Sequence, residues 1–222
     1  GPFQMGASRQ EAGRRANEGE RQVVLQRSFY LAEREVTNRD FLQFQPGHSS
    51  GVAGRQSLEI DTRPVVNVSW DDAARFMNWL SEQDGLPHFY REEQDRMVTV
   101  DPRGIGYRLP TEAEWAFAAR MAGQSERVRY PWAGSYPPQA VAGNFADESA
   151  RHLLPVIISG YTDGFAATAP TGSFAANPAG FYDLGGNVAE WCHDYYSVQT
   201  CGGGSEPDSM GPPKGTHRVV RG

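Results

Sequence analysis

The amino-acid sequence predicts a loop-rich α+β domain in which two main helices, both capped, pack on small antiparallel sheets. Its 222 residues suffice for one full hydrophobic core, so a single domain over residues 1–222 is the expected organisation. The chain contains 25 glycines and 15 prolines, whereas average usage would give roughly 27 of the two together. Much of the backbone should therefore lie in turns, and we expect loop packing and bound ions to hold the fold together.

The N-terminal part alternates between extended and irregular segments. Residues 3–5 alternate apolar and polar side chains, and residues 21–31 form a candidate strand pair. The residues between them, 8–20, are rich in charge and predict a solvated loop.

Helices are predicted where a capping residue precedes an apolar repeat. A short helix is expected after Thr37 or Asn38, and Pro46-Gly47 stops it. The clearest helix covers residues 70–84, with Ser69 as its N-cap. Its apolar residues recur at helical spacing, and they are Ala73, Phe76, Met77 and Leu80.

A further helix is predicted over residues 111–122. Thr111 and Glu114 form a Thr-x-x-Glu capping box, and the helix should end near Gly123. The apolar faces of both longer helices are assigned to the core.

From about residue 130 onward the helical pattern disappears. Short extended runs alternate with turn residues, and residues 202–215 form a loop rich in glycine and proline. The extended runs are Pro131-Trp132, Asn144-Phe145, Tyr161–Phe165 and Gly180–Tyr196.

The charge balance is acidic. The chain has 21 basic and 27 acidic residues, a net charge of −6, and Lys214 is its only lysine. Without a basic cluster, nucleic acid is not an expected partner. No apolar run approaches the roughly 18 residues that cross a bilayer, so we expect no membrane span in this region.

The two ends of the chain give little information about its compartment. The sequence begins without Met and shows no signal peptide, and both ends look cut from a longer polypeptide. The localisation therefore stays open, with an exported or periplasmic site slightly favoured over the cytoplasm.

The cysteines and histidines do not predict a transition-metal site. Cys192 and Cys201 enclose eight residues, which is too wide for a zinc finger or a thioredoxin-like motif. A local disulfide and two independent thiols both remain open. The five histidines are scattered without ligand-like spacing, at positions His48, His88, His152, His193 and His217.

The richest segment of the chain is Gly180–Asp194. Its glycines allow tight turns that expose backbone carbonyls, and Asp183, Asn187 and Glu190 add side-chain oxygens. Oxygen ligands at such spacings suit a hard cation. Ordinary turn-forming roles for the same residues are the alternative.

This segment and six others resemble one family in the same order along the chain. The seven segments are Gly1–Gly6, Glu35–Asn38, Arg63–Trp70, Arg108–Trp115, Tyr130–Trp132, Gly180–Trp191 and Arg218–Gly222. Together they resemble the formylglycine-generating enzymes, or sulfatase-modifying factors. The resemblance implies a variant of the C-type lectin fold.

The same resemblance implies two structural calcium sites. The first would use the side chains of Asn144 and Asp163 and the carbonyls of Phe145 and Phe165. The second would use the carboxylates of Asp183 and Glu190 and the carbonyls of Gly186 and Val188. Calcium takes about 6–8 oxygen ligands, so each set leaves room for water.

Catalysis is the part of the resemblance with the least support in the sequence. Enzymes of this family oxidise a substrate cysteine, in a Cys-x-Pro-x-Arg segment, with oxygen and copper(I) held by two cysteines, which suit that soft ion. The pair follows an Arg-Gly-Gly-Ser-Trp stretch, and this sequence stops at Arg221-Gly222. Copper is expected only if cysteines follow.

Neither cysteine in the sequence replaces that pair. Cys192 and Cys201 lie at positions the family does not use for chemistry, so the catalytic residues are not assigned. Ala189 stands where many oxidase members have Trp, which would change the shape of the peptide groove.

Three functional hypotheses follow. The first is an oxidase acting on a protein or peptide, and the second is a non-catalytic lectin-like module that binds a protein or glycan. A Cys-x4-Cys pair within the next roughly 40 residues would favour the oxidase. The third, an ergothioneine-pathway sulfoxide synthase, requires a helical bundle with iron-binding histidines, which this sequence lacks.

Overall fold

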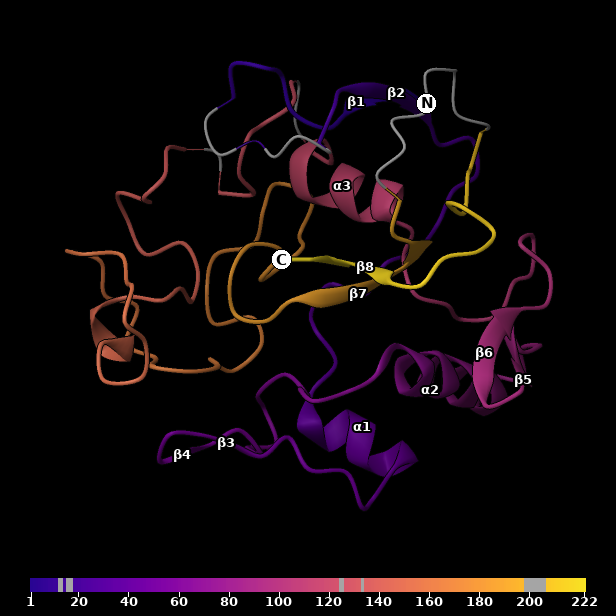
Figure 1. Cartoon of the computed structure of the whole chain (residues 1–222), viewed down its shortest axis with the longest axis horizontal. Coiled ribbons are helices and arrows are strands. Elements are labelled where there is room, and N and C mark those ends of the chain that lie inside the picture. Colours follow the sequence, from indigo (N-terminus) through magenta and orange to yellow (C-terminus); the bar gives the residue numbers. More distant parts are fainter. Residues whose placement is uncertain (12–13, 15–17, 124–125, 133, 198–206) are drawn as a thin grey trace.

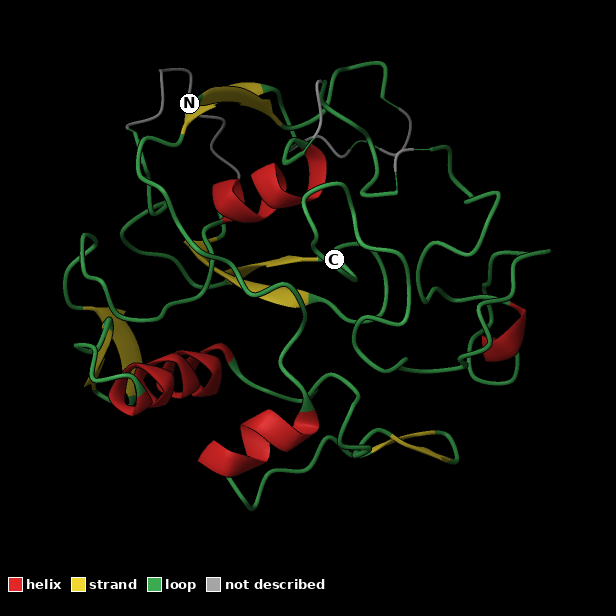
Figure 2. Cartoon of the chain, turned by 180° about the vertical axis from the view of Figure 1, so that it is seen from behind, coloured by secondary structure: helices red, strands yellow, loops and turns green. Residues whose placement is uncertain are grey.

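The computed structural model describes residues 1–11, 14, 18–123, 126–132, 134–197 and 207–222. It confirms the α+β prediction, since helices and short strands alternate among long loops (Figures 1 and 2). The helices are α1 (Asn38–Phe44), α2 (Trp70–Gln83), α3 (Glu112–Arg120) and a single 3-10 turn (Glu148–Ala150). The strands are β1 (Pro2–Met5), β2 (Arg21–Val24), β3 (Val52–Ala53), β4 (Gln56–Ser57), β5 (Tyr90–Glu93), β6 (Arg96–Thr99), β7 (Glu190–Tyr195) and β8 (Arg218–Arg221).

The predicted helices are confirmed together with their caps. The Thr37 side chain caps α1 by accepting from the Asp40 N–H at 3.2 Å. Ser69 caps α2 in the same way, and the helix ends before Gly85, which takes a left-handed φ of 67°. In α3 the Thr111 capping box is formed in both directions.

Among the described residues, the strands form four antiparallel pairs, which confirms the small antiparallel sheets that the sequence predicts. The predicted strand pair over residues 21–31 is correct only in part, because β2 ends at Val24 and pairs with β1 instead of folding back on itself. Of the runs predicted after residue 130, only the last contains a strand, β7. The hairpins β3–β4 and β5–β6 were not predicted.

Two buried clusters lie on either side of the β7–β8 pair, which runs between α3 and α2 in Figure 1. The first joins β1 and β2 to α3 and contains Phe3, Met5, Val23, Leu25, Ala113 and Ala116. The second joins α2 to β5 and β6 and contains Trp70, Ala74, Phe89, Tyr90, Met97 and Leu109. The apolar faces of α2 and α3 are thus core, as predicted.

Strand β7 is tied to both sides by hydrogen bonds. The indole N–H of Trp70 on α2 donates to the Cys192 carbonyl at 2.8 Å, and the His193 N–H donates to the carbonyl of Pro110 at 2.8 Å. These bonds hold β7 in the centre of the molecule. Across the described ranges, every helix is too short or too polar to span a bilayer.

Candidate metal centre

The segment before β7 folds through residues in the left-handed backbone region. Asp183 has a φ of 54°, Gly186 of 94° and Asn187 of 61°. Aspartate and asparagine tolerate this region better than other side chains, and glycine adopts it freely. The turns therefore depend on these residue types, and they lead the chain directly into Glu190 at the start of β7.

Three buried carboxylates meet beside these turns: Glu35, Asp183 and Glu190. Each has one buried oxygen without a hydrogen-bond partner, namely Glu35 Oε1, Asp183 Oδ1 and Glu190 Oε2. Unpaired buried polar atoms are costly, and native proteins contain few of them. Carboxylate oxygens are the type of ligand that a hard cation takes, together with backbone carbonyls.

The surroundings of these three groups favour their neutral forms. Burial, with the nearby Asp183, raises the pKa of Glu35 to about 8. Burial, with Glu35 and then Asp183 as like charges, raises the pKa of Glu190 to about 9. Burial also raises the pKa of Asp183. A divalent cation would reverse these shifts by favouring the ionised carboxylates.

A backbone oxygen faces the same space. A Cβ placed on Gly222 would lie 2.7 Å from the Val188 carbonyl oxygen and 3.1 Å from Glu190 Oε2. These two oxygens therefore border one small volume at the end of β8. The carboxylates alone do not form a group of three side-chain ligands within the described residues, so a cation here would also draw on carbonyls such as that of Val188.

Glu35 is the residue of this centre that sequence reasoning missed. It stands far from the Gly180–Asp194 segment in the chain, in the Glu35–Asn38 motif, and no local spacing connects the two. The fold joins them through Asn187, whose amide N–H donates to Glu35 Oε2 at 2.8 Å. Membership of a matching motif was the only signal that could have identified it.

Three of the four residues of the first predicted site also meet. The Asp163 carboxylate accepts the N–H groups of Phe145 and Phe165, both at 2.8 Å. The Asn144 amide is directed elsewhere, donating to the Ala167 carbonyl and to Asn187 Oδ1. Burial raises the pKa of Asp163.

Asp147 is a second acidic residue that the sequence did not single out. It is fully buried, and its two oxygens accept the N–H groups of Ser149 and Asp163, at 2.8 and 2.5 Å. All carboxylate oxygens of Asp147 and Asp163 thus have partners. The first site is consequently less open to a cation than the centre at Glu35, Asp183 and Glu190.

Asn187 connects the two regions. Its side-chain oxygen accepts from the Ala169 N–H at 2.8 Å and from Asn144 at 3.0 Å, while its amide N–H reaches Glu35. The residues predicted as two separate sites therefore belong to one hydrogen-bonded network. Gly186 lets the two segments of this network pack closely, because a Cβ at this position would lie only 2.5 Å from the Asn144 carbonyl oxygen.

The described residues do not offer a copper(I) site. Cys192 is a free thiol with no exposed surface, and burial together with Asp194 and Glu112 raises its pKa well above the usual value. It therefore stays protonated, whereas copper binding and nucleophilic chemistry need the thiolate. Cys201, the other cysteine of the local disulfide that the sequence leaves open, lies outside the described residues.

Comparison with known proteins identifies the relatives of this chain. The family model "Sulfatase-modifying factor enzyme 1-like domain" matches residues 1–222. The chain is 36% identical, over 172 residues, to the formylglycine-generating enzyme of Thermomonospora curvata, and the match covers 76% of this chain and 46% of that protein. It is 30% identical to the chaperone protein LppX of Paenibacillus barcinonensis, over 87% of this chain and 68% of that one.

Solved structures agree on the fold. Treponema denticola variable protein 1 matches with a TM-score of 0.74 and 23% identity, over 99% of this chain and 79% of that chain. PvdO from Pseudomonas aeruginosa matches with a TM-score of 0.72 and 23% identity, over 100% of this chain and 78% of that chain.

The chain spans less than half of the bacterial formylglycine-generating enzymes that it matches, 46% of one and 45% of another, from Streptomyces coelicolor. The family model nevertheless covers all of its residues. The chain therefore belongs to the sulfatase-modifying factor family, the family of the formylglycine-generating enzymes.

Proposed function

We propose that this chain is a calcium-stabilised domain that binds a protein or peptide segment. The observation that carries the calcium assignment is the set of three unpartnered buried oxygens on Glu35, Asp183 and Glu190. Calcium bound there would neutralise the repulsion among the carboxylates and fix the turns that precede β7. The side chain of Glu35 would join the ligands predicted from the sequence, which already include the carbonyl of Val188.

The proposal of a protein or peptide ligand rests on the family. The relatives named formylglycine-generating enzymes are 36% and 32% identical to this chain, and the family oxidises a cysteine within a peptide segment. We extend only the binding step to the described residues. Their buried thiol, Cys192, cannot supply the copper ligands, so any oxidation would rely on cysteines outside them.

A peptide that contains Cys-x-Pro-x-Arg tests this proposal. A fluorescent version should bind to residues 1–222 in excess calcium, and binding should weaken when chelator removes the ion. Mass spectrometry of the peptide should detect no aldehyde after incubation with copper(I) and oxygen. Aldehyde formation abolished by Cys192→Ser would make the thiol catalytic and contradict the proposal.

The control is the same peptide with its cysteine, proline and arginine replaced by alanine. Equal binding of both peptides would show that the motif is not recognised. In that case the alternative, a lectin-like module for another protein or a glycan, would replace the peptide-binding proposal, while the calcium proposal would stand on its own test.

A further inference from the structure

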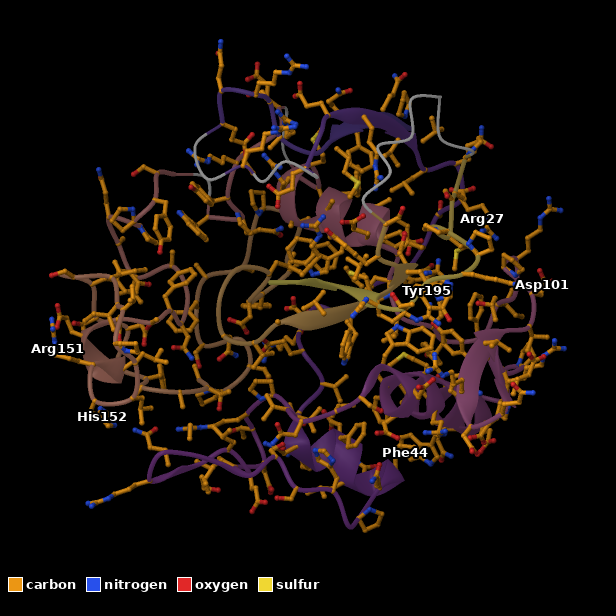
Figure 3. The ribbon with its side chains drawn as sticks, viewed as in Figure 1. Arg27, Phe44, Asp101, Arg151, His152 and Tyr195 are labelled. Carbon is orange, nitrogen blue, oxygen red and sulfur yellow. The ribbon has the colours of Figure 1, made fainter. Side chains whose placement is uncertain are left out.

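A large cavity lies at the end of the β7–β8 pair that is remote from the metal centre. Its volume is about 1080 Å³, and its walls come from the loop after β2, from β6, from the ends of β7 and β8 and from residues 207–213. Tyr195 and Arg218 pair at this end, whereas Glu190 and Arg221 pair at the other. Figure 3 places the labelled Arg27, Asp101 and Tyr195 together on this side of the molecule.

The cavity is cationic although the chain carries a net charge of −6. Arg27, Arg103 and Arg218 line it, and Asp208 is the one acidic residue among the lining residues described. Asp208 is already paired with Arg27, at 3.4 Å. Arg103 is exposed, and its guanidinium has no partner in the described ranges. Positive charge is therefore left over at this surface.

Arg218 is held in a fixed plane. Its guanidinium carbon lies 3.4 Å from the ring centroid of Trp70 and 3.5 Å from that of Tyr195, so it is stacked between two aromatic rings. Its Nη1 donates to the His193 carbonyl at 2.6 Å. A guanidinium fixed in this way keeps donors for a planar or tetrahedral oxyanion at little entropic cost.

His193 adds a polar wall rather than a charge. Its Nδ1 bonds to the Tyr90 hydroxyl at 2.9 Å, and its Nε2 lies 3.4 Å from Thr99 Oγ1. Prolines such as Pro102 supply rigid apolar walls, and Met210 adds a flexible apolar side chain. The volume is that of a site for an organic molecule, far larger than a single ion requires.

We propose that this cavity binds a small organic anion whose phosphate, sulfate or carboxylate group is held by Arg218 and Arg103, with its uncharged body against the proline and methionine walls. The proposal is independent of the calcium centre and of peptide binding. Arg218 would supply the oriented donors, and Arg103 would add the free charge.

Calorimetric titration with sugars of one common body tests the proposal and distinguishes the anions. Glucose 6-phosphate, glucose 6-sulfate and glucuronate are titrated in excess calcium and low salt, with glucose as the neutral control. At least one of the three anions should bind while glucose does not. The anion that binds most tightly identifies the acidic group that the cavity prefers. Equal heats for all four, or none for any, would overturn the proposal.

Matched variants locate the binding. Arg103→Gln should weaken binding of the anion about tenfold, since one charged hydrogen bond is lost. Arg218→Lys should weaken binding further, because it removes the planar guanidinium and its paired donors. The control is Arg39→Gln, an exposed arginine on α1 outside the cavity. Circular dichroism confirms that each variant folds.

Two results would contradict the assignment. Equal weakening by Arg39→Gln and Arg103→Gln would show that only net charge attracts the anion. Binding of an acidic peptide in the cavity with no binding of the three sugars would make it a protein-docking surface instead.

Discussion

At the residue scale, the proposed metal centre rests on acids whose protonation a bound cation would change. Glu35 and Glu190 have pKa values near 8 and 9 because they are buried beside like charges. Without a cation, both would be largely protonated at neutral pH. With one, they would be ionised, so binding should release protons.

Replacing either glutamate by its neutral isostere should separate these two states. Glu190→Gln and Glu35→Gln should remove most of the stabilisation by calcium, which is about 2.7 kcal/mol at a hundredfold excess over the dissociation constant. In chelator the same variants should be as stable as the unmodified chain or more stable, because the repulsion is relieved. Thermal melts with calcium and with chelator measure both effects.

The control is Glu82→Gln, which changes an exposed glutamate on α2 that bonds to His88. It should leave the calcium response unchanged. A calcium response that survives in both centre variants would remove Glu35 and Glu190 from the site.

His193 should give stability a dependence on acid pH. Burial, with Arg218 and Arg108 nearby, lowers its pKa to about 3. In the unfolded chain the pKa of His193 is near 6.5, so on acidification the unfolded chain takes up the proton before the folded chain does. The contribution of His193 to the free energy of unfolding is therefore lost as pH falls from about 6.5 towards 3, by at most about 1.4 kcal/mol per pH unit. Burial raises the pKa of neighbouring Asp194 to about 6, which acts in the opposite sense.

Comparing the unmodified chain with a variant isolates the contribution of His193 to stability. Urea unfolding of the unmodified chain and of His193→Gln, at pH values between 7 and 4, should show a smaller loss of unfolding free energy for the variant. Parallel curves would mean that His193 does not titrate on unfolding in this range.

At the element scale, caps are features that a local sequence specifies. At the start of α3, Thr111 is buried and its N–H donates to Glu114 Oε2 at 2.8 Å. Arg108 donates two hydrogen bonds of 2.7 Å to the same carboxylate. Thr111→Ala should destabilise the chain by about 1–2 kcal/mol, measured by urea unfolding. Thr111→Ser keeps the capping oxygen and should cost less; an equal loss in both variants would assign the effect to packing.

The elements that the sequence did not predict depend on contacts or on unusual turns. The β5–β6 hairpin turns through Gln94 and Asp95, with φ of 51° and 63°, instead of the Asn-Gly pair that would have signalled it. Strand β2 stops at Val24 because its partner β1 has only four residues. Caps act within one helical turn, so they were predictable, whereas pairing partners depend on the whole chain.

The metal centre divides in the same way. Asp183 and Glu190 could be proposed as ligands from the sequence, because one short segment contains both and the resemblance implies them. Glu35 was not singled out as a ligand, because only the fold brings the Glu35–Asn38 segment beside Asn187. Local spacing can therefore indicate part of a ligand set, and topology completes it.

At the scale of the whole molecule, one strand pair connects the two functional regions. The metal centre lies where Glu190 faces Arg221, and the cationic cavity lies where Tyr195 faces Arg218. Strand β7 is tied to α2 through the Cys192 carbonyl, which accepts from the Trp70 indole N–H, and to α3 through the Asp194 carboxylate, which accepts from the Glu112 N–H. Loosening the metal end should therefore loosen the centre of the fold, since few other strands support it.

Chelation should accordingly lower the thermal midpoint of the whole chain. A loss of about 2.7 kcal/mol corresponds to roughly 5–10 °C for a domain of this size. The transition should stay single, because β7 contacts both buried clusters and cannot melt alone. Differential scanning calorimetry measures the midpoint with calcium, with chelator, and with chelator followed by excess calcium. An unchanged midpoint in chelator would contradict cation binding by the three carboxylates. If magnesium restored the midpoint as well as calcium, the large, flexible oxygen shell proposed here would be wrong.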